Sequence, residues 1–215
     1  MSPAAIPASA VRRNEPGRNG LLLCAIDCFS SHGYAGTSID RIARAAGVTK
    51  GAIYYHFRDK HQLLYASIKN RIAAFEAAVL ARVEKLDDPR EALGEIARMC
   101  AEIARTDNHR RFILTLMVET LGTDPELSAE FKTMMHRFRA FQAHMIRRGQ
   151  SRRIFRAAID PDLAAEAFVA GILGAELQYY QDPKTVDIRR TVATQVEQML
   201  AWLDKPARVS GRGRS

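Results

Sequence analysis

Residues 37–64 read TSIDRIARAAGVTKGAIYYHFRDKHQLL and predict two short helices joined by a tight turn. Thr37 is predicted to cap the first helix, because its hydroxyl can accept a hydrogen bond from the backbone N–H three residues on. Gly47 follows the last apolar position of that helix and tolerates the left-handed conformation that a sharp helix end requires. Thr49 is predicted to cap the second helix. This punctuation indicates a helix-turn-helix.

A third helix is predicted to begin almost directly after the second. Asp59 and Gln62 repeat the capping pattern immediately before Leu63 and Leu64. Apolar residues then recur every three or four positions as far as Leu86, which predicts one long helix with almost no linker before it.

The segment Lys50 to Phe57 has the properties of a helix that reads DNA. The major groove admits one helix whose first turn touches base edges. Small residues keep that turn thin, and hydroxyl, cationic and aromatic side chains are available for bases and phosphates. The predicted DNA contacts are Thr37, Thr49, Lys50, Gly51, Ala52, Tyr54, Tyr55, His56 and Lys60. In the alternative interpretation the rings belong to a core and the lysines to a solvated surface. We accept the core interpretation for Ile53 and Phe57, since three packed helices need an apolar centre.

A dense set of residues at fixed spacing runs through residues 19–66. The set comprises Ala25, Phe29, Gly33, Tyr34, Thr37, Ile42, Ala43, Gly47, Val48, Thr49, Lys50, Gly51, Tyr54, His56, Phe57, Lys60 and Leu63. In these residues the chain resembles the TetR family of one-component transcriptional regulators. The resemblance implies an all-α homodimer with a DNA-binding domain and a larger domain that senses a ligand and forms the dimer. It implies little about the ligand, because the larger domains of this family diverge widely.

Length and composition agree with this organisation. A chain of 215 residues is long enough for a small domain fused to a larger helical one. We predict an all-α fold of about nine helices, with the following division of the chain: a flexible arm at 1–18, a helix-turn-helix DNA-binding domain at 19–66, a ligand-sensing and dimerisation domain at 67–204, and a flexible basic tail at 205–215. Asp-Pro pairs at 88–89, 124–125 and 160–161 predict helix starts, and Gly122 and Gly149 predict helix ends.

The net charge of +8 is concentrated at the two ends of the chain. Residues 1–60 carry eight Lys or Arg against four acids, and residues 205–215 carry four against none, whereas the rest is balanced. A basic N-terminal region fits a polyanionic partner such as DNA. The arginines before residue 19 either reach DNA as an arm or belong to a disordered end.

Several other classes of protein are disfavoured. No stretch approaches the roughly 18 to 20 apolar residues of a membrane span, and the N-terminal segment lacks the apolar region of a secretion signal. Cys24, Cys28 and Cys100 cannot form a disulfide framework, which favours a reducing cytoplasm. No metal and no cofactor are expected, since Cys24 and Cys28 lack His or Cys partners nearby. An enzyme is disfavoured because no nucleophile, base and orienting residue recur at usable spacing.

The larger domain is rich in Met and Phe, which adapt to apolar ligands of irregular shape. The predicted ligand contacts are Met99, Phe112, Met117, Glu119, Met134, Phe138, Met145, Phe168 and Glu176. Glu119 and Glu176 are predicted to lie in apolar surroundings and to pair with a cationic ligand or an internal Arg. For most of the apolar members, a place in the ordinary core is the alternative. The expected effector is a small apolar or amphipathic molecule.

The last two predicted helices are candidates for contact between two subunits. A stripe of small residues allows close approach of a neighbour, and glycine costs about 1 kcal/mol in a helix interior. Two copies would form a four-helix bundle with two-fold symmetry. The predicted interface residues are Ala164, Ala167, Gly171, Gly174, Ala175, Val192, Val196, Met199 and Leu203. Packing within one chain is the alternative explanation of the stripe.

Together these features predict a ligand-responsive transcriptional regulator, most simply a repressor that leaves a palindromic operator when its effector binds. The effector would act through its different affinities for two states of the dimer. The alternative is a helix-turn-helix adaptor or architectural DNA-binding protein without a small-molecule ligand.

Overall fold

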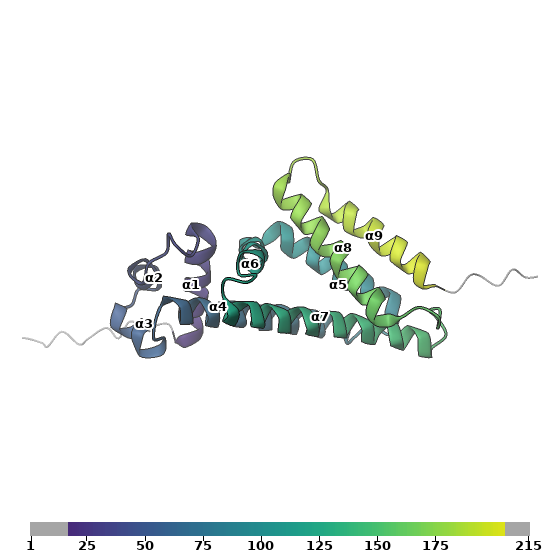
Figure 1. Cartoon of the computed structure of the whole chain (residues 1–215), viewed down its shortest axis with the longest axis horizontal. Coiled ribbons are helices and arrows are strands. Elements are labelled where there is room, and N and C mark those ends of the chain that lie inside the picture. Colours follow the sequence, from purple (N-terminus) through teal and green to yellow (C-terminus); the bar gives the residue numbers. More distant parts are fainter. Residues whose placement is uncertain (1–16, 205–215) are drawn as a thin grey trace, which may run out of the picture. The chain divides into compact units, whose positions relative to one another are not determined.

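The computed structural model describes residues 17–204, and this part of the chain contains nine α-helices (Figure 1). Their bounds are α1 (Arg18–His32), α2 (Ile39–Ala46), α3 (Lys50–His56), α4 (Lys60–Val83), α5 (Pro89–Thr106), α6 (Asn108–Glu119), α7 (Pro125–Ser151), α8 (Pro161–Gln181) and α9 (Ile188–Leu203). The all-α prediction is therefore confirmed. The described residues form two compact units, of which one ends at Asn70 and the other begins at Arg71. Most of the predicted arm and the whole predicted tail lie outside the described residues.

The first unit packs α1, α2, α3 and the start of α4 around a small apolar core. Its fully buried side chains are Leu21, Leu22, Ala25, Ile26, Phe29, Ile42, Ile53, Phe57, Leu63, Leu64 and Ile68. Burial of a side chain of this size contributes about 1.5–3 kcal/mol, so the core can hold four short segments in place. The core interpretation of Ile53 and Phe57 is confirmed.

The helix caps and turns of the first unit are as predicted, except for the cap of α2. Gly47 ends α2 at φ 69°, in the left-handed region, and Thr49 caps α3 by accepting the Ala52 N–H at 3.2 Å. The prediction that Thr37 caps α2 is wrong, because the cap is Ser38, whose hydroxyl accepts the Arg41 N–H at 3.2 Å.

The start of α4 carries the predicted capping pair. The Asp59 carboxylate accepts the Gln62 N–H at 2.8 Å, and the Gln62 side chain in turn accepts the Arg58 N–H at 2.6 Å. Hydrogen bonding to the Gln62 N–H and to Arg58 lowers the pKa of Asp59 below its usual value. Two reciprocal bonds therefore fix where α4 begins.

The second unit is built from the rest of α4 and from α5 to α9. Asp88, Asp124 and Asp160 cap α5, α7 and α8, and proline occupies the first turn of each of these helices, as predicted. α5 packs against α7, α8 and α9, and α8 packs against both α7 and α9. All of the long helices of the second unit thus contribute side chains to its core, and many of these side chains come from α5.

One predicted helix end is wrong. Gly149 does not terminate α7, which continues to Ser151. Gly149 is instead buried within the helix, and a β-carbon at this position would overlap the ring of the fully buried Phe155. The glycine therefore provides room for a neighbouring side chain rather than a left-handed turn.

Candidate functional site

α3 has a buried side and an exposed side. Ile53 and, directly after the helix, Phe57 are buried in the core of the first unit. Tyr55 is 85% exposed and Tyr54 52% exposed, which is unusual for rings of this size. The Tyr55 ring stands nearly perpendicular to the ring of exposed His56, with centroids 5.0 Å apart. The core thus fixes the orientation of α3 while its aromatic side chains face outward.

The first turn of α3 is thin and carries hydrogen-bonding groups. Thr49, Lys50 and Gly51 are exposed and Ala52 is half-buried. A β-carbon at Gly51 would meet the Thr49 hydroxyl oxygen at 3.6 Å, an ordinary contact, so packing within the unit does not require glycine here. The Lys50 ammonium lies 2.7 Å from the Asp40 carboxylate, and both side chains are more than half exposed. A pair this exposed contributes little to stability and leaves the lysine available to a phosphate.

Two of the predicted DNA contacts have structural partners of their own. The Thr37 side chain is buried, and its hydroxyl lies 3.1 Å from the Cys28 carbonyl oxygen and 2.7 Å from that of Gly33. This burial excludes a side-chain contact with DNA, so the prediction for Thr37 is wrong in this conformation. The Lys60 ammonium donates to the carbonyl oxygens of Tyr34 at 2.9 Å and Thr37 at 3.0 Å, and lies 4.1 Å from the centroid of the Tyr34 ring. Lys60 therefore joins the start of α4 to the turn between α1 and α2.

Two exposed cations that flank α3 in the sequence were absent from the predicted contacts. Arg44 lies on α2, and Arg58 follows Phe57, where its side chain contacts Asp59 at 3.0 Å. Their signal in the sequence was the excess of basic residues in this region. It does not distinguish one arginine from another.

The predicted ligand contacts are spread over different parts of the second unit. Met134 and Phe138 line two different cavities, and Phe168 lines a groove between α8 and α9. The others divide as follows: Met99 and Met145 are buried in the core, Phe112 and Met117 are half-buried, and Glu119 is exposed. The prediction that Glu119 lies in apolar surroundings is therefore wrong, because its side chain is exposed in the last turn of α6.

Glu176 has the internal partner that the sequence allowed. Its carboxylate is fully buried and accepts hydrogen bonds from Arg110, the shortest from Nη2 at 2.8 Å and two more from Nε at 3.1 and 3.2 Å. Burial alone would lower the pKa of Arg110, but the neighbouring carboxylate raises it. The pair connects α6 with α8. Because a buried charge without a partner costs several kcal/mol, neither side chain is expected to be dispensable.

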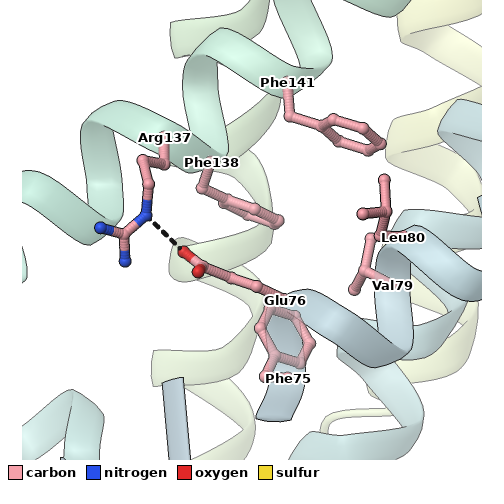
Figure 2. A pocket seen from close by; sticks show the side chains of 7 residues that line it. All are labelled: Phe75, Glu76, Val79, Leu80, Arg137, Phe138 and Phe141. Carbon is pink, nitrogen blue, oxygen red and sulfur yellow. Dashed lines mark hydrogen bonds and ion pairs between the residues drawn. The ribbon is translucent and has the colours of Figure 1, made fainter. Parts of the chain in front are cut away.

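Two cavities of the second unit lie beside α4. The α4–α7 cavity has a volume of about 170 Å³ and is lined by Phe75, Glu76, Val79, Leu80, Arg137, Phe138 and Phe141. Figure 2 shows Phe138 and Phe141 extending from α7 toward Val79 and Leu80 of α4, with Phe75 at the other end of the view. The α4–α6 cavity has a volume of about 160 Å³ and is lined by Arg71, Ile72, Ala74, Phe75, Ala78, Ile103, Asp107, Arg110, Ile113 and Met134.

The predicted subunit interface divides into two groups. Ala164, Ala175, Val192 and Leu203 are buried in the core of their own chain, so their prediction as interface residues is wrong. The remaining members, Ala167, Gly171, Gly174, Val196 and Met199, are exposed or half-buried.

The two glycines of this stripe serve different neighbours. A β-carbon at Gly171 would lie 3.2 Å from the Gln195 side chain, so close packing of α8 and α9 accounts for that glycine. At Gly174 a β-carbon would meet open space. Leu163, Leu177 and Trp202 are also exposed, at 60%, 52% and 41%. The exposed face of α8 and the end of α9 are therefore apolar.

None of the helices among the described residues is both long enough and apolar enough to cross a bilayer.

Comparison with known proteins gives matches to both units. Residues 21–66 match the family described as bacterial regulatory proteins, tetR family, and residues 89–201 match the BetI-type transcriptional repressor C-terminal family. The regulator AcrR of Shigella flexneri is 35% identical over 103 residues, which are 46% of this chain and 47% of AcrR. The regulator RutR of Escherichia coli O157:H7 is 26% identical over 77% of this chain and 74% of RutR. The chain thus spans about half the length of the first of these relatives and three quarters of the second.

A solved structure has the same fold. SmeT of Stenotrophomonas maltophilia in complex with triclosan superposes with a TM-score of 0.75 at 24% identity, covering 88% of this chain and 92% of SmeT. At that identity the likeness concerns the fold. The two family matches cover the helix-turn-helix and most of the second unit, and the chain belongs to the TetR family of bacterial regulatory proteins.

Proposed function

We propose that this chain is a dimeric, ligand-responsive repressor that inserts α3 into the major groove of a palindromic operator in the cytoplasm. The observation that carries the proposal is the exposure of Tyr54 and Tyr55 on a helix whose other side is anchored by Ile53 and Phe57. Large rings held rigidly toward solvent suit a partner that reads base edges and phosphates.

The proposed DNA-contacting surface consists of the first turn of α3 and its exposed aromatic residues. Its members are Thr49, Lys50, Gly51, Ala52, Tyr54, Tyr55 and His56. Arg44 and Arg58 join it as phosphate contacts, because both are exposed cations that flank α3 in the sequence. Thr37 and Lys60 are left out, since their polar atoms bond to the backbone of the first unit.

A dimer would form through the apolar face of α8 and the end of α9. The exposed Leu163, Leu177 and Trp202 support this, as does Gly174, because no described residue of the chain lies within 4 Å of where its β-carbon would be. Two copies related by a two-fold axis would present two α3 helices to half-sites one DNA turn, on the order of 34 Å, apart.

An effector would bind the second unit and favour a state with a different separation of the two α3 helices. SmeT, which shares the fold, has been solved with triclosan bound, and this supports a small apolar or amphipathic effector. Converting a mostly bound population to a mostly released one requires about 5.5 kcal/mol of preference for the released state.

The test of DNA binding is footprinting on DNA that flanks the chain's own coding sequence, with fluorescence anisotropy at several salt concentrations. Wild type should protect a palindrome, and Tyr55→Ala should weaken binding to it at least tenfold, whereas Tyr55→Phe isolates the contribution of the hydroxyl. Tyr65→Ala, on α4, is the matched control and should bind normally. Protection of no site, or equal binding by Tyr55→Ala and wild type, would contradict the proposal.

A further inference from the structure

The two cavities beside α4 share one lining residue, Phe75. Each is smaller than the roughly 300–1,000 Å³ that sites for drug-sized ligands occupy. We propose that the two cavities are halves of one effector site that joins when the Phe75 side chain moves, and that the site takes an elongated apolar molecule carrying one anionic group. This inference rests on the proposed function and specifies its ligand.

Phe75 lies between a residue of one cavity and a residue of the other. Its ring centroid is 6.0 Å from that of Phe138, which lines the α4–α7 cavity, and the interplanar angle is 56°. The Arg110 guanidinium, which lines the α4–α6 cavity, lies 5.7 Å from the same ring. Phe75 is half-buried, and the two neighbours on its own helix that line the second cavity, Ala74 and Ala78, are small. Joining the cavities therefore calls for a change of side-chain rotamer at Phe75, beside which Ala74 and Ala78 are small.

The charged side chains on the cavity walls lie in three ion pairs. The α4–α6 cavity is lined by two guanidiniums, Arg71 and Arg110, and by one carboxylate, Asp107. Glu176 neutralises Arg110 but is itself fully buried and does not line the cavity. In the α4–α7 cavity the one cation and the one carboxylate pair with each other at 2.9 Å. Each of the three cations of the combined lining thus has a carboxylate partner, so an anionic ligand must compete with one of these carboxylates.

Arg71 is the guanidinium that a ligand can recruit. Arg110 is held by three hydrogen bonds to Glu176, whereas the Arg71 side chain is 32% exposed and pairs with Asp107. Asp107 also caps α6, where it accepts the His109 N–H at 2.9 Å. Its charge would therefore remain stabilised by the helix N-terminus when Arg71 turns toward a ligand.

The remaining lining is apolar and suits a hydrocarbon body. Ile72, Ala74, Ala78, Ile103, Ile113 and Met134 surround the charged end, and Val79, Leu80, Phe138 and Phe141 continue beyond Phe75. The ligand's anionic end would then lie at Arg71 and its apolar end between α4 and α7.

The head group is tested by calorimetry on the full chain with three probes of equal chain length: decanoate, decan-1-ol and decyltrimethylammonium, the two ions below their micelle concentrations and the alcohol below its solubility limit. Wild type should bind decanoate at least tenfold more tightly than the alcohol, because a charge-assisted contact is worth about that factor or more. Arg71→Gln should abolish this preference. Arg82→Gln is the matched control, since Arg82 lies on the same helix, pairs with Glu95 at 3.0 Å and lines neither cavity. Equal affinity for the three probes, or an unchanged preference in Arg71→Gln, would overturn the inference.

The joining of the cavities is tested by chain length. Along the series from butanoate to dodecanoate, wild-type affinity should rise about fourfold per methylene until the joined site is full. Phe75→Trp should stop this rise at a shorter acid, and Phe75→Ala should not. If affinity rises with chain length in the same way in all three proteins, the Phe75 side chain does not separate the two cavities and the inference is refuted.

Operator binding without any probe is measured in parallel on each variant. A chain that binds its operator but shows no preference for carboxylate refutes this inference and leaves the proposed function standing. Wild-type chain that binds no operator refutes the proposed function itself.

Discussion

Replacement of Lys60 by methionine separates a structural role from a role in DNA contact. The substitution keeps most of the aliphatic side chain but removes two charge-assisted hydrogen bonds to the Tyr34 and Thr37 carbonyl oxygens, together with the stacking on the Tyr34 ring. Each such bond contributes about 1.5 kcal/mol at the lower end of the usual range, and the ring contact about 0.5 kcal/mol. The regained side-chain entropy of up to about 2 kcal/mol opposes these losses, so we expect a net destabilisation of about 2 kcal/mol.

Hydrogen exchange followed by mass spectrometry measures this loss within the first unit. A destabilisation of about 2 kcal/mol corresponds to roughly 30-fold faster exchange of the amides between α1 and α2. Lys69→Met is the matched control, because it removes the same charge from the same helix, where the ammonium lies 5.4 Å from the Tyr65 ring. The salt dependence of operator binding should keep its slope in Lys60→Met. Unchanged exchange combined with a slope reduced by about one would show that Lys60 contacts a phosphate, and would refute our assignment.

Three further predictions concern the second unit and the cysteines. Gly149→Ala should destabilise the chain by about 1–3 kcal/mol in urea unfolding, despite the better helix propensity of alanine, because the added methyl overlaps Phe155; a stabilised variant would contradict this. Gly174→Gln should convert the dimer to monomers in analytical ultracentrifugation. If the variant instead stays dimeric and its free energy of unfolding rises by about 1 kcal/mol through better helix propensity, this face does not form the interface. Burial raises the pKa of Cys100 to about 12, so a thiol reagent at pH 8 should modify half-exposed Cys24 in the native chain and reach Cys100 only on unfolding; rapid labelling of Cys100 would show that α5 opens.

Local signals in the sequence were sufficient for most of the helix boundaries. The αL turn at Gly47, the cap at Thr49 and the Asp-Pro helix starts depend on residues within one helical turn of each other, and the structure has them as predicted. The first cap was misassigned because Thr37 and Ser38 are adjacent hydroxyls. Only the packing of Thr37 against α1 decides between them.

Contacts between distant segments limited the prediction of the sites. Gly149 looks like a helix end because the sequence does not show that the Phe155 ring needs its space. The small-residue stripe of α8 has the periodicity expected for either an internal or an external partner, so the inward side of Ala175 and the open side of Gly174 could not be told apart. The lining of the α4–α7 cavity draws on two helices, and that of the α4–α6 cavity draws on four. Their membership depends on tertiary packing that no single periodicity encodes.

The bond between Arg110 and Glu176 limits how this chain can diverge. Loss of either member strands a charge in the interior at about 3–5 kcal/mol, whereas replacement of both by well-packed apolar residues can be neutral. Homologous chains are therefore expected to retain both ionic residues or neither. Chains that keep only one of the two ionic residues would be selected against because they are unstable, whatever their effect on regulation.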